Sequence, residues 1–247
     1  MKLTVLGIWG GYPAAGGATS SFLLEEEGFR LLLECGSGVL AQVQRYVSLA
    51  QLDAVMVSHY HHDHVADLGC LQYGMLVQQR TGQRQQPLPI YGHSLDKPQF
   101  DRLTYKNGAV TKGMPLSAGE PVTVGPWRIL ACEAKHSVPC LALKFETAAG
   151  RSLVYTADTE WSADVLNLAA GADVLIAETT LDDAQAGAVP GHLTAGEAGR
   201  LARQACVGRL VLTHFSHGLD LDRLRRQAEA AFAGSVELAM PGMAIEL

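Results

Sequence analysis

The chain has 247 residues, a formal net charge of −6 and no basic run, which argues against a long nucleic-acid track held by surface Lys and Arg. Apolar residues make up 48% of the chain, enough for a sizeable core in a single domain spanning residues 1–247. A small anionic substrate remains compatible with this composition, because a bound metal can supply positive charge locally.

The cysteines and the N-terminus bear on the cellular compartment. The five cysteines are odd in number and form no C-x-x-C pair, so we expect no disulfide framework and a reducing compartment. Residues 1–11 are expected to form a first strand and not a signal peptide. No apolar run approaches the about 20 residues that a membrane-spanning helix needs. We therefore expect a soluble cytoplasmic protein without a membrane partner.

Short apolar segments alternate with longer amphipathic ones along the chain. In the first half we expect strands at 2–8, 22–26, 29–34, 53–57 and 89–91, with helices at 39–49, 65–79 and 95–103. In the second half we expect strands at 122–124, 128–132, 140–146, 153–156, 173–177, 210–213 and 236–239, with helices at 163–169, 194–206 and 220–233. Thr194 and Glu197 form a capping-box pattern. This grouping predicts two sheets packed face to face and covered by helices.

The densest chemical signal is the segment from Ser58 to His64, in which four histidines and one aspartate lie within six residues. The segment follows a predicted strand, and a loop at a strand end can direct several side chains to one spot. Imidazole and carboxylate groups together suit zinc, with iron or manganese as chemical alternatives. The candidate ligands are His59, His61, Asp63 and His64. For Tyr60 and His62, which alternate with them, we expect a supporting role.

Three further ligand candidates follow predicted strands downstream. A zinc ion needs about four ligands, and hydrolytic sites often hold two metals about 3.5–4 Å apart. His136, Asp158 and His214 each come after an apolar strand. Any one of them alone could be an ordinary buried histidine or a helix cap. Their recurrence at strand exits favours a shared metal site.

The order His-x-His-x-Asp-His, then His, then Asp, then His, resembles the metallo-β-lactamase superfamily over nearly the whole chain. The resemblance implies an α/β fold, the four-layer αββα sandwich, and two bound Zn²⁺ ions, with Mn²⁺ or Fe²⁺ as alternatives. Members often dimerise, so a homodimer is the implied candidate assembly. The implied ligands form three sets: His59, His61 and His136 on the first metal, Asp63, His64 and His214 on the second, and Asp158 between the two.

Two metals predict a hydrolase, because shared coordination lowers the pKa of a water and yields hydroxide near neutral pH. The hydroxide can attack phosphorus or a carbonyl carbon. Asp63 can orient the water or take its proton.

Further segments are similar to the ribonuclease Z branch of this superfamily: Thr-Ala-Asp158-Thr, Ala-Glu178-Thr-Thr, Thr-His214-Phe-Ser and Gly191-His192-Leu-Thr-Ala-Gly-Glu-Ala-Gly. The similarity implies that Glu178 holds His192, and that His192 protonates the departing oxygen of a phosphodiester. The alternative for Glu178 and His192 is a buried ion pair with a helix cap.

One departure from the branch concerns the substrate. Transfer-RNA-processing members carry a long arm that grips the RNA, and residues 137–157 leave no room for it between His136 and Asp158. We therefore predict a phosphodiesterase that cleaves a small phosphodiester, such as a cyclic nucleotide or a short oligonucleotide. A carboxylic-ester, thioester or lactone hydrolase is the alternative. A transfer-RNA 3′-processing endonuclease and a non-catalytic metal-binding protein are less favoured.

Overall fold

Two seven-stranded mixed sheets organise the chain in the computed structural model, which describes residues 1–247. One sheet belongs to unit 1, made of Met1–Leu116 and Met240–Glu246, and the other to unit 2, made of Ser117–Ala239 and Leu247. In each sheet, three antiparallel strand pairings lie at one end and three parallel pairings at the other. The same pairing pattern therefore occurs once in each unit.

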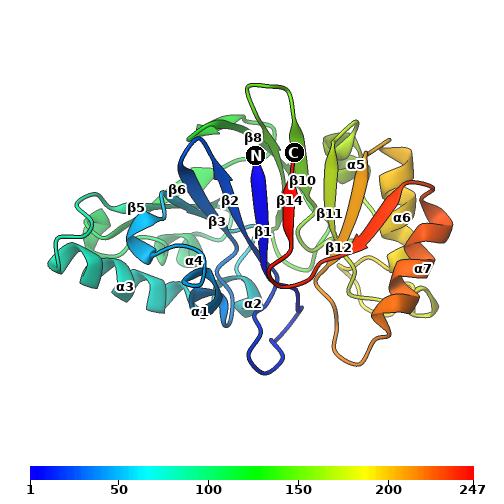
Figure 1. Ribbon diagram of the computed structural model, residues 1–247, viewed down its shortest axis with the longest axis horizontal. Coiled ribbons are helices and arrows are strands. Elements are labelled where there is room, and N and C mark those ends of the chain that lie inside the picture. The colour runs from blue at the N-terminus through cyan, green and yellow to red at the C-terminus, as the bar shows by residue number, and fades with distance from the viewer. The chain divides into compact units, whose positions relative to one another are not determined.

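The sheet of unit 1 has the order β14-β1-β2-β3-β4-β5-β6. Its strands are β1 (Lys2–Gly7), β2 (Ser21–Glu26), β3 (Phe29–Leu33), β4 (Ala54–Met56), β5 (Leu88–His93), β6 (Thr111–Leu116) and β14 (Ala244–Glu246). Figure 1 shows β14 beside β1, where the two strands pair antiparallel. The last residues of the chain thus return to the sheet that the first residues begin.

Four helices accompany this sheet: α1 (Val39–Val43), α2 (His62–Val65), α3 (Leu68–Arg80) and α4 (Lys97–Asp101), with 3₁₀ turns η1 (Leu49–Gln51) and η2 (Lys106–Gly108). Buried Val39 and Val43 of α1 and Leu71 and Met75 of α3 share one apolar cluster with buried residues of the strands. Their spacing of four residues places each pair on one helix face, which is why these faces are apolar.

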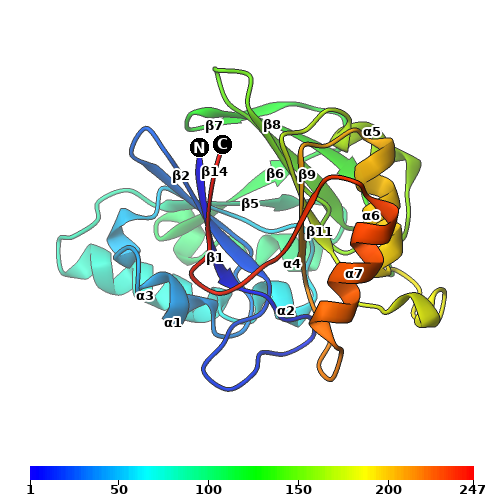
Figure 2. The same ribbon diagram turned by 45° about the vertical axis from the view of Figure 1, so that its right-hand side comes forward.

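The sheet of unit 2 has the order β13-β12-β11-β10-β9-β8-β7. Its strands are β7 (Val122–Val124), β8 (Trp127–Glu133), β9 (Leu141–Glu146), β10 (Ser152–Tyr155), β11 (Val174–Glu178), β12 (Arg209–Thr213) and β13 (Ser235–Leu238). Its helices are α5 (Ala163–Ala169), α6 (Ala195–Gln204) and α7 (Leu221–Ala231), with a 3₁₀ turn η3 (Asp183–Gln185). Figure 2 shows α6 and α7 side by side, and they are in contact. No helix of the chain combines the length and apolar character needed to cross a membrane.

Parallel strand pairing determines where the polar residues at the strand ends lie. In unit 1, β3 and β4 are parallel, and in unit 2, β10, β11 and β12 are parallel. Because the carboxyl ends of parallel strands meet at one edge of a sheet, residues directly after these strands are brought together within their own unit. Glu34 and Ser58 follow the two strands of unit 1 at such an edge.

Two predicted helices differ from the structure. The helix predicted at 39–49 is wrong in length, because α1 ends at Val43 and the separate turn η1 begins behind Ser48. Ser48 and Gln51 form a capping box that starts this new turn. The helix predicted at 65–79 is interrupted between α2 and α3, and α2 already begins at His62. The histidine segment is therefore partly helical and not simply a loop.

Two edge strands were not predicted from the sequence. Strand β6 contains Gly113 and Pro115, which are poor strand formers, and it pairs only with β5 at the sheet edge. Strand β14 has three residues and pairs only with β1. The capping box of Thr194 and Glu197 is confirmed at the start of α6.

The contact between α6 and α7 gives a stability prediction. A Cβ added at Gly199 of α6 would lie 2.5 Å from the backbone oxygen of Ala228 in α7, whereas one at Gly69 of α3 would meet nothing within 4 Å. Gly199→Ala should lower the free energy of unfolding by about 1–3 kcal/mol through overpacking. Gly69→Ala should raise it by about 0.4–1 kcal/mol, because alanine has less backbone freedom to lose on folding. Urea denaturation of both variants measures the difference, and equal effects would contradict the packing at Gly199.

Candidate metal centre

The first cluster of candidate ligands lies in unit 1, where β4 ends and α2 begins. His61 is the extended N-cap residue of α2, and Asp63 and His64 are buried in its first turn. The His59 Nε2 atom lies 3.1 Å from His61 Nδ1, and His64 Nε2 lies 3.6 Å from Asp63 Oδ2. The rings of His59 and His64 are 4.1 Å apart between centroids. All four candidates of the histidine segment are thus brought together.

Neighbouring groups fix the orientation of these side chains. Ser58 Oγ lies 3.0 Å from His59 Nδ1. The backbone N–H of Gly11 donates to Asp63 Oδ2 at 2.7 Å. The contacts come from two different loops, and they hold the side chains of His59 and Asp63 in place.

Glu34 is a supporting residue that the sequence analysis missed. Its side chain is fully buried, accepts a hydrogen bond from the Ser58 N–H at 3.2 Å, and lies 3.4 Å from His64 Nδ1. A carboxylate at the Nδ1 side of a histidine directs the Nε2 atom toward a metal and increases its basicity. The signal in the sequence was a charged residue placed directly after three leucines, Leu31 to Leu33.

The second cluster lies in unit 2, where β8, β10 and β12 end. His136 Nε2 lies 3.9 Å from Asp158 Oδ2, and His214 Nε2 lies 3.4 Å from Asp158 Oδ1. The three side chains are at most 3% exposed. The predicted convergence of these three residues on one spot is therefore present in the structure.

His136 is held through Gly191. The His136 Nδ1 atom donates to the Gly191 carbonyl at 2.9 Å, so its Nε2 atom is the one directed to Asp158. Gly191 has φ +90, and a Cβ at this position would lie 2.7 Å from His136 Nδ1. Only glycine fits this position, both for its backbone conformation and for the approach of the ring.

Glu160 in turn holds Gly191. The Gly191 N–H donates to Glu160 Oε1 at 2.9 Å, and the other carboxylate oxygen forms an ion pair with Lys135. Hydrogen bonds from Lys135 and from the Gly191 backbone lower the pKa of Glu160. The carboxylate therefore stays charged at neutral pH. It links Lys135, which precedes His136 in the chain, to Gly191, which precedes His192.

Glu178 and His192 form the predicted pair. Glu178 Oε1 lies 2.9 Å from His192 Nδ1, and Glu178 is fully buried whereas His192 is 15% exposed. Thr180 Oγ1 lies 2.9 Å from His214 Nδ1, and the rings of His192 and His214 stack with centroids 5.9 Å apart. The catalytic candidate thus lies directly beside a ligand candidate.

Glu178, His192 and His214 could also hold a metal themselves, since their ligand atoms lie within 4.8 Å of one another. The hydrogen bonds of Glu178 argue against this. Its two oxygens accept from His192 Nδ1 and from three backbone N–H groups, those of Thr159, Thr180 and Leu193. Three of these bonds go to Oε1 and one to Oε2, so Oε1 has no acceptor position left for a metal. Through Oε1, Glu178 is an anchor for His192.

The donor atoms in each unit suit a divalent metal. Four ligands at about 2.0–2.1 Å from a tetrahedral ion lie about 3.3 Å from one another. The candidate donors in each unit are separated by 3.1–3.9 Å and combine imidazole nitrogen with carboxylate oxygen. The residues therefore fit the expected metal chemistry.

Comparisons with known proteins show the family to which this chain belongs. Residues 29–215 match the model of the β-lactamase superfamily domain, and the chain belongs to this family. It is 42% identical over 246 residues to the probable metallo-hydrolase YhfI of Bacillus subtilis, with complete coverage of both chains. It is 30% identical over 312 residues to ribonuclease Z of Myxococcus xanthus, covering 100% of this chain and 98% of that protein.

Solved structures show the same relationship. The crystal structure of the metallo-β-lactamase fold protein YhfI from Bacillus subtilis matches with a TM-score of 0.96 at 41% identity, covering 100% of this chain and 99% of that one. The short form of human tRNase Z matches with a TM-score of 0.75 at 25% identity, covering 100% and 99%. The predicted metallo-β-lactamase fold and the ribonuclease Z-like branch are confirmed, and the chain is a metallo-hydrolase of that superfamily.

The contact between Glu160 and Gly191 yields a prediction about metal binding. Glu160→Ala should free Gly191 and loosen His136, so that zinc affinity falls about 10–100-fold. Competition with a chromogenic chelator measures this. Glu146→Ala is the matched control, because Glu146 is also ion-paired, with Arg128 and Lys144, but contacts no ligand candidate. Equal zinc affinities of the two variants would contradict the role of Glu160.

Proposed function

We propose that the chain is a dinuclear-metal phosphodiesterase that cleaves small phosphodiesters, such as a cyclic nucleotide or a short oligonucleotide. The observation that carries this proposal is the Glu178–His192 pair beside His214. A phosphodiester with an alkoxide leaving group needs a proton donor, since an alkoxide is a poor leaving group.

The metal centre is proposed as the sequence predicts it. Two Zn²⁺ ions, with Mn²⁺ or Fe²⁺ as alternatives, are proposed for one hydrolase domain on the ligands that the family resemblance implies. When bound, such ions activate a water near neutral pH and offset negative charge on the phosphate. The proposed ligands are His59, His61 and His136 for one ion, Asp63, His64 and His214 for the other, and Asp158 for both.

The residues of the chain then have distinct tasks. Glu178 accepts the hydrogen bond of His192 Nδ1, so His192 Nε2 is the nitrogen that would deliver a proton to the departing oxygen. Asp63 is held by the Gly11 N–H through one carboxylate oxygen and is proposed to orient the attacking water or to take its proton.

The preference for a small substrate is supported by the chain between His136 and Asp158. This segment contains only β9 and β10 with a turn between them, and no arm. The net charge of −6 also argues against a long RNA track. Ribonuclease Z is the name of several relatives, so transfer-RNA processing is one outcome of the tests below. The homodimer and the cytoplasmic location remain predictions.

The proton-donor role has a direct test. His192→Ala should lower kcat about 10²–10⁴-fold on 2′,3′-cyclic nucleotides and dinucleotides, which have alkoxide leaving groups. It should lower kcat much less on bis-(4-nitrophenyl) phosphate, because nitrophenolate leaves without protonation. Glu178→Gln should show the same selectivity more weakly. Zinc content and circular dichroism of the variants control for folding.

Several results would overturn this proposal. Equal loss of activity on both kinds of diester would exclude His192 as the proton donor. Turnover confined to a carboxylic ester, thioester or lactone would favour the alternative hydrolase. Turnover confined to a transfer-RNA precursor would favour the processing endonuclease, and zinc binding without turnover would indicate a non-catalytic protein.

Metal stoichiometry gives an independent prediction. The wild-type chain should bind two zinc ions, and Asp158→Asn should bind at most one, because the proposed bridging carboxylate is lost. Mass spectrometry of the dialysed proteins measures this. Asp164→Asn is the matched control, since Asp164 is an exposed residue in the first turn of α5. A wild-type protein with a single zinc ion would contradict the dinuclear centre.

A further inference from the structure

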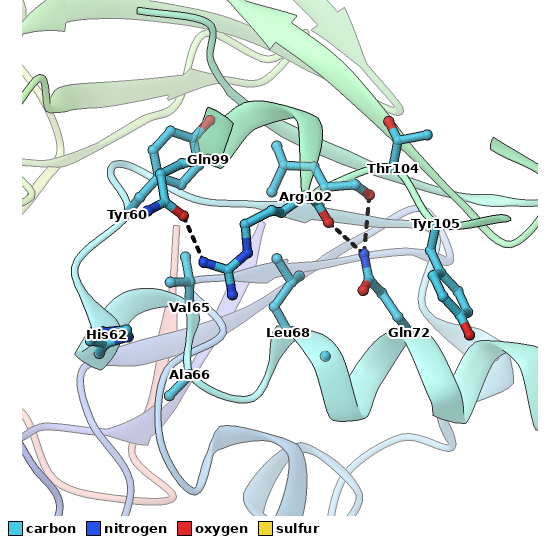
Figure 3. Close-up of a pocket in the computed structure, with 12 residues that line it drawn as sticks. Tyr60, His62, Val65, Ala66, Leu68, Gln72, Gln99, Arg102, Thr104 and Tyr105 are labelled. Carbon is cyan, nitrogen blue, oxygen red and sulfur yellow. Dashed lines mark hydrogen bonds between the residues drawn. The ribbon is translucent and has the colours of Figure 1, made fainter. Parts of the chain in front are cut away.

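A cavity of about 400 Å³ lies in unit 1, between α2, α3 and the segment that follows α4 (Figure 3). His62 and Val65 line it from α2, and their spacing of three residues puts them on one helix face. None of the proposed metal ligands lines the cavity. It is therefore a site separate from the candidate metal centre, although its wall continues into the same histidine segment.

Arg102 brings a positive charge into this cavity. In Figure 3 its guanidinium group lies among the lining side chains, beside Gln99 and between Val65 and Leu68. Its Nη1 atom donates to the neutral Gln99 Oε1 at 2.9 Å, and no carboxylate lies within ion-pair distance of it. A guanidinium without an acidic partner, in a concave site, is suited to bind a phosphate or carboxylate through two parallel hydrogen bonds.

Gln72 provides a hydrogen-bond acceptor at the floor of the cavity. Its side chain is buried, and its Nε2 atom donates to the carbonyl of Arg102 at 2.8 Å and to Thr111 Oγ1 at 3.2 Å. These bonds fix the amide group, and Figure 3 shows the contact with the Arg102 backbone. The Oε1 atom takes part in neither bond, so it remains as an acceptor for an N–H group of a ligand.

Two aromatic rings complete the lining. The Tyr60 hydroxyl donates to the His93 carbonyl, which fixes that ring, and Tyr105 lies at the other end of the cavity in Figure 3. Leu68 and Leu103 add apolar surface to the lining. Apolar and aromatic walls with a few fixed polar groups are the usual composition of a small-molecule site, and the volume lies within the usual range of about 300–1,000 Å³.

We propose that this cavity binds a small phosphomonoester that carries a planar ring, the chemistry of a nucleoside monophosphate. Arg102 binds the phosphate, Gln72 Oε1 accepts from an N–H group of the ring, and Tyr105, which lies beside Gln72 in Figure 3, contacts the ring itself. The assignment stands on the lining of the cavity and does not depend on the proposed phosphodiesterase activity.

The place of His62 gives this site a connection to the metal centre. His62 lies in the chain between the ligand candidates His61 and Asp63. A ligand that contacts His62 therefore lies next to the backbone segment that carries both. Since hydrolysis of a phosphodiester yields a phosphomonoester, the site would recognise the class of product that the proposed reaction forms.

Photolabelling tests the proposal. Zinc-loaded protein is irradiated with 8-azidoadenosine 5′-monophosphate, and the labelled peptides are identified by mass spectrometry. The label should lie on the peptide that contains Tyr105, and unmodified adenosine 5′-monophosphate should compete for it about tenfold better than adenosine does. Arg102→Gln should reduce this labelling about tenfold.

Arg45→Gln is the matched control for this experiment. Arg45 is exposed and donates from Nη1 to Gln42 Oε1 at 3.0 Å, a contact of the same kind and spacing as that of Arg102 with Gln99. Its labelling should equal that of the wild type. Both arginines are exposed, so neither substitution disturbs the core.

Two results would overturn the proposal: labelling confined to peptides that carry the proposed metal ligands, or equal labelling of Arg102→Gln and the wild type. The His192→Ala variant separates this proposal from the phosphodiesterase. It should keep the label while losing turnover of cyclic nucleotides. A wild-type enzyme that hydrolyses diesters but shows no label would refute only the nucleotide site.

Discussion

A histidine is useful to a metal only if one ring nitrogen is fixed while the other points inward, and polar contacts at the outer nitrogen impose this on four of the proposed histidine ligands. His59 is held by Ser58, His64 by Glu34, His136 by Gly191 and His214 by Thr180. An imidazole that could rotate would lose rotamer freedom on binding a metal, whereas a fixed one has already lost it during folding. The rest of the site depends on this prior ordering.

Unusual backbone conformations also help to position the side chains of the site, and each of them costs conformational free energy. Glu34, Ala157 and His214 have φ between 52 and 65, in the left-handed region that residues other than glycine rarely adopt. Each such residue costs about 1–3 kcal/mol and persists only where its surroundings require it. All three lie within two residues of a strand end, where the chain must turn sharply to direct a carboxylate or imidazole toward the cluster. The buried strands of each sheet supply the apolar contacts that offset the cost.

Much of this organisation was accessible from the sequence. The apolar strands were predicted because buried parallel strands are nearly continuous runs of apolar residues, as in Leu31 to Leu33 or Val174 to Ala177. The spacing of the histidine segment predicted its four candidate ligands, because their order is local. Strand β6 escaped prediction, since only pairing with β5 makes its Gly113 and Pro115 acceptable.

The supporting residues of the site could not be predicted in the same way. The partner of Glu34 lies 24 positions away in the chain, and the partner of His136 lies 55 positions away. Such pairs depend on tertiary structure, and nothing in the residues around Glu160 or Thr180 distinguishes them from ordinary surface or strand-end residues. The Glu178–His192 pair was found only because a family resemblance supplied the pairing.

The segment between Asp182 and Gly191 has a consequence for the evolution and engineering of this protein. It is clamped at both ends, by the ion pair of Asp182 with Arg223 and by the hydrogen bond of Gly191 with Glu160, while residues 183–190 are exposed. Insertions or exchanges in this stretch need not displace His192, because the second clamp lies beside it. New recognition elements can be grafted there while His192 keeps its position.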